Sequence, residues 1–162
     1  MKVSKLIISV VFFSQLIFSQ SESNTRFGIK GGVSLTFFNQ FDGANFGFDQ
    51  RVLTEAYGGV FVDFKIDEGF HIQPELLYIG LGDFEFLNAP IYVKYDVAKA
   101  ISLAVGPSMN YFFDLFVNKF KIRGDINTAW HLNDDLDINL KYTLGFEEFS
   151  PKVLFIGLGY RF

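Results

Sequence analysis

Eight long segments of alternating apolar and polar residues predict an all-β fold: an eight-stranded antiparallel up-and-down transmembrane β-barrel, preceded by a cleaved signal peptide. Three observations support this prediction: the length of the segments, the small uncharged residues on one polar face, and the aromatic residues near the segment ends. The composition agrees, because 49 % hydrophobic residues and 22 Phe exclude a disordered chain. A chain of 162 residues has room for one domain.

The first residues have the pattern of a secretory signal peptide. Two lysines precede the uncharged apolar run Leu6–Phe18, and small or polar residues follow it. This run is shorter than the roughly 20 residues that a membrane-spanning helix needs, which favours a cleaved signal over an anchor. We therefore expect residues 1–21 to be the signal peptide and residues 22–162 to form an outer-membrane β-barrel domain.

The strands are predicted from apolar residues at every second position. In the fifth segment, Ile101 and Leu103 lie on one face, and Ser102 and Ala104 lie on the other. The predicted strands are Arg26–Phe37, Thr54–Ile66, Gly69–Leu81, Glu85–Val97, Ala100–Phe112, Lys119–His131, Asp135–Glu147 and Lys152–Phe162. Tight and wider connections alternate between them, which is typical of an up-and-down meander that can close.

Alternation alone does not say whether the apolar faces point to a core or to lipid. The segments are about twice as long as the ~5–6 residues of a typical soluble strand and can cross a bilayer at a tilt of ~45°. The polar face of the fifth segment carries no charge, which is unusual for a sheet that faces water. Aromatic residues gather near the segment ends, as in membrane-interface girdles, at Phe37, Phe38, Tyr111, Phe112, Phe113, Phe146, Phe149, Tyr160 and Phe162. We therefore predict lipid-facing apolar faces and a closed barrel, since open sheet edges are costly in hydrocarbon.

Outward apolar faces place charged residues inside the barrel. The predicted interior charge network consists of Lys30, Asp63, Glu75, Lys94, Arg123, Asp125, Lys141 and Arg161, with Lys65 also on the inward face. Buried charges need partners, and we predict an ion pair between Glu75 and Lys94 on neighbouring strands. Because side chains can fill an eight-stranded interior, we interpret the network as a salt-bridged plug. An ion or proton path is the functional alternative.

Several kinds of chemistry are not expected. A net charge of −4 without a basic cluster argues against a nucleic-acid partner, and the absence of Cys excludes thiolate sites. His71 and His131 are predicted on the inward face near the tight turns, but no third ligand is evident, so we predict neither a metal site nor a cofactor. Barrels that act on lipid A need a His-containing group at the loop end. We expect no enzymatic activity, because both histidines lie at the other end.

Two features qualify the scheme. The connection Phe38–Leu53 is expected to be a long loop that could grip a partner or a hydrophobic ligand, cover the barrel, or sit among lipid headgroups. Its candidate contact residues are Phe41, Phe46 and Phe48. Proline also falls inside three predicted strands, at Pro74, Pro90 and Pro107. Since proline lacks the N–H that a ladder needs, we expect bulges or distortions there.

Several stretches resemble the PorT-like outer-membrane β-barrel domain family, which is widespread in Bacteroidota. They are "FGIKGGVSLTFF" (27–38), "QPELLY" (73–78), "NAPIYVKYDV" (88–97), "VGPSMNYFF" (105–113) and "LGYRF" (158–162). The resemblance implies an integral outer-membrane barrel in which Glu75 and Lys94 match inward acidic and basic positions. It also implies a link to the type IX secretion apparatus, the machinery to which PorT is tied.

The last strand carries a second resemblance. Gly157, Tyr160 and Phe162 are similar to the C-terminal signal by which the outer-membrane assembly machinery recognises its clients. The sequence thus predicts an exported, non-enzymatic outer-membrane protein with a structural or partner-binding role in the cell envelope. The alternatives are a component of a secretion apparatus, a conduit for small hydrophobic ligands, and a lipid-modifying enzyme. The expected partners are outer-membrane lipid, the assembly machinery, and envelope or secretion proteins.

Overall fold

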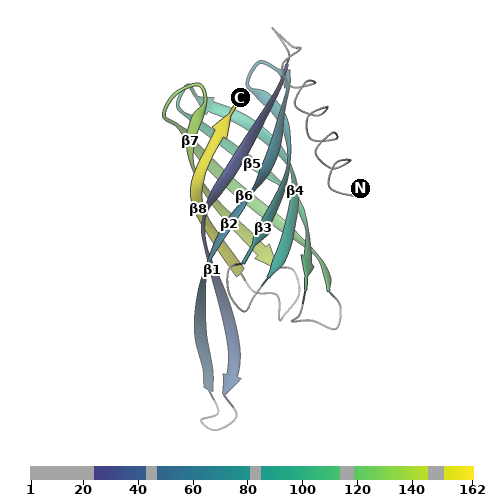
Figure 1. The fold of residues 1–162 in the computed structure, drawn as a ribbon, viewed down its shortest axis with the longest axis vertical. Helices are drawn as coiled ribbons and strands as arrows, with labels where there is room; N and C mark the ends of the chain where they lie inside the picture. The colour runs from purple at the N-terminus through teal and green to yellow at the C-terminus, as the bar shows by residue number, and fades with distance from the viewer. Residues whose placement is uncertain (1–23, 43–46, 81–84, 114–118, 146–151) are drawn as a thin grey trace, which may run out of the picture.

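The computed structural model describes residues 24–42, 47–80, 85–113, 119–145 and 152–162, without the side chains of 38–51, and they form one closed barrel (Figure 1). The strands are β1 (Thr25–Asp42), β2 (Gly47–Asp67), β3 (Phe70–Ile79), β4 (Phe86–Ala98), β5 (Ile101–Phe112), β6 (Phe120–His131), β7 (Leu136–Gly145) and β8 (Lys152–Arg161). Each strand pairs antiparallel with the next, and β8 pairs with β1. The predicted eight-stranded antiparallel barrel is therefore confirmed. The predicted signal peptide lies outside the described residues.

The two ends of the barrel differ. The connections β2–β3, β4–β5 and β6–β7 are short and lie beside the start of β1 and the end of β8, so we call this the tight-turn end. Gly69 in the first of them has a φ of 75°, which glycine adopts without strain. Strands β3, β5 and β7 end at the opposite end of the barrel, which we call the loop end. None of the described residues belongs to a helix long and apolar enough to cross a membrane.

The first hairpin is longer than predicted. Strand pairing continues from Phe38 opposite Arg51 to Asp42 opposite Gly47, so the prediction of a long loop over Phe38–Leu53 is wrong. Figure 1 shows this hairpin extending beyond the barrel wall at the loop end. An antiparallel ladder needs only its neighbour strand, so it can run past the point where the apolar alternation ends. Phe41 and Phe48 lie opposite each other in this extension, and Phe46 lies outside the described residues.

Side chains alternate between the two faces of the wall as predicted. On β5, Ile101, Leu103 and Val105 are exposed on the outer surface, whereas Ser102 and Ala104 are buried inside. The same pattern holds for the other strands, and the described residues as a whole expose 31 large hydrophobic residues. Soluble proteins rarely expose contiguous apolar patches larger than a few hundred Å². The outer surface of this barrel is therefore suited to lipid.

Exposed aromatic residues gather at both ends of the wall. Those near the tight turns include Phe70, Tyr95, Trp130, Tyr160 and Phe162, and those near the loop end include Tyr78, Tyr111 and Phe120. One predicted member of these girdles is wrong: Phe112 points inward and stacks on Phe86 with ring centroids 4.9 Å apart. It follows the exposed Tyr111, and successive strand residues face opposite ways. Phe37 is half-buried, whereas the Phe38 side chain, Phe146 and Phe149 lie outside the description.

The prolines do not shift the strand register. Phe61 lies opposite Glu75 and Phe64 lies opposite Ile72, so the register is the same on both sides of Pro74. The β3–β4 and β4–β5 pairs likewise keep one register past Pro90 and Pro107. The expectation of bulges at the prolines is therefore wrong. The alternative expectation of local distortions agrees with the structure, because strand pairing is interrupted beside each proline although the register is kept. Register shifts occur beside tight turns instead, between Lys65 and Asp67 and between Asp96 and Ala98.

Candidate functional site: the charged barrel interior and its cavity

All eight residues of the predicted interior charge network are buried inside the barrel, none more than 7 % exposed. They are Lys30, Asp63, Glu75, Lys94, Arg123, Asp125, Lys141 and Arg161. Lys65, also predicted to face inward, is exposed at the mouth of a cavity at the tight-turn end. The alternation of each strand was enough to place these residues on the inner face. Their partners depend on the strand register.

Lys30 and Glu75 form an ion pair in the middle of the barrel. The Gln73 side chain donates a second hydrogen bond to the same Glu75 oxygen, at 2.7 Å. The predicted pair of Glu75 and Lys94 is therefore wrong. The β3–β4 register places Lys94 opposite His71 rather than opposite Glu75. Lys94 instead forms an ion pair with Asp63.

A second polar cluster surrounds Asp125. This carboxylate accepts hydrogen bonds from Ser108 Oγ at 2.8 Å and from the Tyr92 hydroxyl at 3.1 Å. Lys141 lies with its Nζ 3.8 Å from Asp125 and donates a hydrogen bond to the side-chain oxygen of Asn88 at 2.5 Å. Asn88 and Tyr92 both lie on β4, and the other three side chains lie on β5, β6 and β7. They connect β4, β5, β6 and β7 across the interior.

An apolar layer that the sequence analysis did not predict lies toward the loop end. It consists of Tyr57, Leu77, Ile79, Phe86, Phe112, Val153 and Phe155. The polar cluster borders it directly, since Lys141 Nζ lies 3.9 Å from the ring centroid of Phe155. Arg123 Cζ lies 4.8 Å from the centroid of Phe112. The sequence could have indicated this layer, because its aromatic residues occupy positions of their strands that the alternation places on the inner face.

Gly157 makes room for part of this interior. A Cβ atom at Gly157 would lie 2.2 Å from the Tyr57 hydroxyl. That hydroxyl donates a hydrogen bond to the side-chain oxygen of Asn139 at 3.1 Å. Gly157 was predicted as part of an assembly signal, and the structure gives this glycine a packing role as well. Tyr160 and Phe162 lie exposed on the outer surface.

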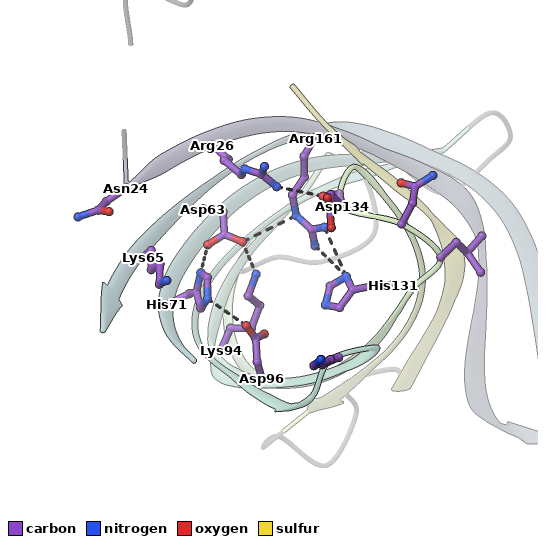
Figure 2. A pocket seen from close by; sticks show the side chains of 13 residues that line it. Asn24, Arg26, Asp63, Lys65, His71, Lys94, Asp96, His131, Asp134 and Arg161 are labelled. Carbon is purple, nitrogen blue, oxygen red and sulfur yellow. Dashed lines mark hydrogen bonds and ion pairs between the residues drawn. The ribbon is translucent and has the colours of Figure 1, made fainter. Parts of the chain in front are cut away.

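The tight-turn end contains a cavity of about 570 Å³ (Figure 2). Its lining residues are Asn24, Arg26, Asp63, Lys65, His71, Lys94, Asp96, Lys99, His131, Leu132, Asn133, Asp134 and Arg161. Both histidines of the chain line it, at the end of the barrel where the sequence placed them. The described residues contain no group of three or more His, Cys, Asp or Glu side chains that is arranged to hold a metal ion.

Asp63 is the centre of the cavity wall. Its carboxylate pairs with Lys94, lies 2.6 Å from His71 Nδ1 and lies 3.8 Å from Arg161 Nε (Figure 2). His71 also reaches Asp96, with 3.3 Å between Nε2 and Oδ2. These residues come from β2, β3, β4 and β8. A single carboxylate thus connects strands from both sides of the β1–β8 seam.

His131 and Ser102 form a hydrogen-bonded pair that the sequence analysis missed. His131 Nε2 lies 3.1 Å from Ser102 Oγ, and Arg161 lies 3.4 Å from His131 Nδ1. A guanidinium only donates, so Nδ1 accepts and the ring proton is on Nε2. Nε2 therefore donates to Ser102 and cannot take its proton, and Asp137 binds Arg161 at 2.7 Å rather than orienting the histidine. The pair lacks the arrangement that activates a serine nucleophile.

No protein-family model matches the chain, and no curated protein matches it. Solved structures do. Neisserial surface protein A (NspA) matches with a TM-score of 0.58 and 10 % identity, over 88 % of this chain and 98 % of that one. The chain has the fold of an eight-stranded outer-membrane β-barrel.

Further matches agree on this fold. Ail of Yersinia pestis, in complex with the heparin analogue sucrose octasulfate, matches with a TM-score of 0.56 and 11 % identity over 85 % of this chain and 99 % of that one. A de novo designed transmembrane β-barrel matches with a TM-score of 0.53 and 13 % identity over 88 % and 99 % of the two chains. Designed and natural barrels both match this chain. The similarity therefore shows the fold but does not indicate a particular function.

Proposed function

We propose that this chain is an exported integral outer-membrane protein whose barrel passes no solute and which acts in the cell envelope through structure and partner binding. The observation that carries this proposal is an apolar outer wall around an interior filled by buried side chains. In this proposal, the tight-turn end faces the periplasm, since barrels of this kind have short periplasmic turns and longer outer loops.

The outer wall supports a membrane location. Exposed apolar residues cover the strands, and exposed aromatic residues lie at both ends, as expected for a wall in contact with lipid. NspA, a surface protein, and the N-terminal barrel domain of Pseudomonas aeruginosa OprF share this architecture. We extend an outer-membrane location to this chain on those grounds.

The filled interior supports a closed barrel. The Lys30–Glu75 pair, the Asp125 cluster and the apolar layer are all buried inside the barrel. Eight strands enclose a space that side chains can fill. A conduit for hydrophobic ligands would need an open apolar path, and side chains such as Phe86 and Phe112 are fully buried in that region.

A role without catalysis agrees with the interior chemistry. The Ser–His pair of the cavity has its ring proton on the wrong nitrogen for nucleophile activation, because Arg161 donates to His131. The cavity also lies at the tight-turn end, which would face away from the lipid A of the outer leaflet. A lipid-modifying enzyme is the least supported alternative.

The β1–β2 hairpin supports a partner-binding role. The pairing of β1 with β8 ends at Phe37, and the pairing of β2 with β3 begins at Tyr57. The hairpin beyond these points extends out of the barrel at the loop end (Figure 1). Its strand edges offer backbone groups to which a partner strand could be added. A role in a type IX secretion apparatus rests on the PorT-like resemblance alone.

Conductance in planar lipid bilayers tests the closed barrel. We expect the purified, refolded protein to give no single-channel steps, whereas a porin reconstituted in the same membranes gives them. Steps that scale with the amount of folded protein would overturn the closed barrel and favour a conduit.

Co-purification from mildly solubilised outer membranes tests partner binding. The matched control replaces residues 40–49 by a two-residue Asn-Gly turn, which shortens the hairpin and keeps the barrel strands intact. We expect the full chain to retain a stoichiometric partner that the shortened chain loses. Equal recovery of every protein with both chains would contradict binding through the hairpin.

A further inference from the structure

We propose that the cavity at the tight-turn end binds a small oxyanion, a phosphate or carboxylate group, through cations at its mouth and in its wall. The volume of about 570 Å³ is in the range of about 300–1,000 Å³ that is usual for small-molecule sites. This inference concerns the cavity alone and does not depend on whether the barrel conducts.

The charge of the lining favours an anion. The chain as a whole has a net charge of −4, yet the cavity lining has five Lys or Arg against three Asp. The cations are Arg26, Lys65, Lys94, Lys99 and Arg161, and the anions are Asp63, Asp96 and Asp134. Positive charge is thus concentrated in one hollow of an acidic protein, which raises the local concentration of anions.

The cations at the mouth are available to a ligand. Lys94 is paired with Asp63, whereas Arg26 donates from Nη1 to the uncharged backbone oxygen of Asp134 at 3.0 Å. Lys65 and Lys99 are exposed, and within the described residues neither side-chain ammonium group has a hydrogen bond or an ion pair. These two lysines can reorient toward an anion without breaking an existing contact.

A buried donor in the wall is a second, independent observation. Arg161 is 6 % exposed, and its Nε makes no hydrogen bond within the described structure, although Asp63 Oδ2 lies 3.8 Å away. A buried donor without a hydrogen bond is costly. An oxyanion in the cavity would supply the missing acceptor, and guanidinium groups suit the planar geometry of carboxylate and phosphate.

The two histidines make the site observable. The chain contains only two, and both line the cavity, so selective isotope labelling of histidine gives NMR signals from the cavity alone. The probe is inorganic phosphate, titrated into the protein in neutral detergent at constant pH and constant ionic strength. We expect the imidazole signals of His71 and His131 to shift and to saturate.

Variants at the mouth test which side chains bind the probe. We expect Lys65→Gln and Lys99→Gln each to weaken phosphate binding about threefold, which corresponds to the loss of one exposed ion pair. The matched control is Lys152→Gln, which removes an exposed lysine at the loop end and should leave the affinity unchanged. Shifts that do not saturate, or an equal loss of affinity in all three variants, would overturn the proposal.

The same oxyanion chemistry occurs in free metabolites and in lipid headgroups. The titration is therefore repeated in nanodiscs of phosphatidylcholine and in nanodiscs of phosphatidylglycerol. Weaker apparent phosphate binding in phosphatidylglycerol nanodiscs than in phosphatidylcholine nanodiscs supports the site and identifies a lipid headgroup as its ligand. In that case the phosphatidylglycerol headgroup competes with phosphate for the cavity. Equal binding in both supports the site with a free anion as its ligand.

Discussion

Lys30 on β1 and Glu75 on β3 form an ion pair that crosses β2 inside the barrel. The β1–β2 register places Lys30 opposite Gly59, which has no side chain. The lysine can therefore extend over β2 and reach a carboxylate two strands away. The two residues connect the first strand to the third across the inner face of the second.

Removal of this carboxylate should destabilise the barrel. We expect Glu75→Leu to lower the free energy of unfolding by about 3–5 kcal/mol, because Lys30 is left buried without its counter-charge. The measurement is urea unfolding in detergent micelles, followed by heat-modifiable mobility on gels. Glu68→Gln, in an exposed turn, is the control and should have little effect.

A double variant distinguishes loss of the ion pair from other effects of replacing Glu75. Adding Lys30→Met to Glu75→Leu removes both charges, so most of the lost stability should return. If the double variant were as unstable as Glu75→Leu, the ion pair with Lys30 would not explain the loss.

Two adjacent glycines of β2 should respond very differently to alanine. A Cβ atom at Gly59 would lie 2.0 Å from the Leu76 carbonyl oxygen, whereas one at Gly58 would lie 3.9 Å from its nearest neighbour. We expect Gly59→Ala to cost at least about 1–3 kcal/mol through overpacking, or to prevent folding. Gly58→Ala should be nearly neutral. Equal folding yields and unfolding midpoints for the two variants would show that β2 and β3 do not approach this closely.

A charge on the outer wall should be costly in proportion to its depth in the membrane. Val105 lies in the middle of β5 with 53 % exposure, and Ile101 lies at its tight-turn end with 40 %. We expect Val105→Arg to cost about 2–4 kcal/mol and Ile101→Arg about 0–1 kcal/mol, measured as unfolding from lipid vesicles. A soluble barrel would tolerate both substitutions, so equal and negligible costs would argue against a lipid-facing wall.

The predicted assembly signal can be tested apart from stability. Phe162 is 63 % exposed, and its contact with Phe27 is a backbone hydrogen bond of 2.8 Å, which Phe162→Ala retains. We expect this variant to refold normally in micelles and to accumulate poorly in the outer membrane of cells. Leu158→Ala, on the same outward stripe, is the control. Similar cellular levels of the two variants would contradict a recognition role for Phe162.

Local periodicity made most of the wall predictable. On β5 the alternation of Ile101, Ser102, Leu103 and Ala104 gave both the strand and the direction of each side chain, and the structure agrees. A strand's period of two is a property of neighbouring residues. This period does not depend on the other strands. For the same reason, the sequence could also predict which charged residues face the interior.

The partners of those charges were not predictable in the same way. Glu75 and Lys94 are on neighbouring strands and face the same interior, yet the register separates them along the barrel axis. His131 and Arg161 meet across β7, which lies between their strands. Such contacts depend on how eight strands are staggered around a closed ring, and alternation within one strand contains no information on that stagger.

The sequence by itself determined that this chain builds eight strands with an apolar outer face and charges inside, because side-chain direction repeats every two residues along a strand. The tertiary structure alone decided that Lys30 pairs with Glu75, that Phe86 and Phe112 fill the loop end, and that a cavity lies between Asp63, His131 and Arg161. The reason is physical: closure of the barrel brings distant strands within a few ångströms of each other, and only the shared register settles which side chains meet.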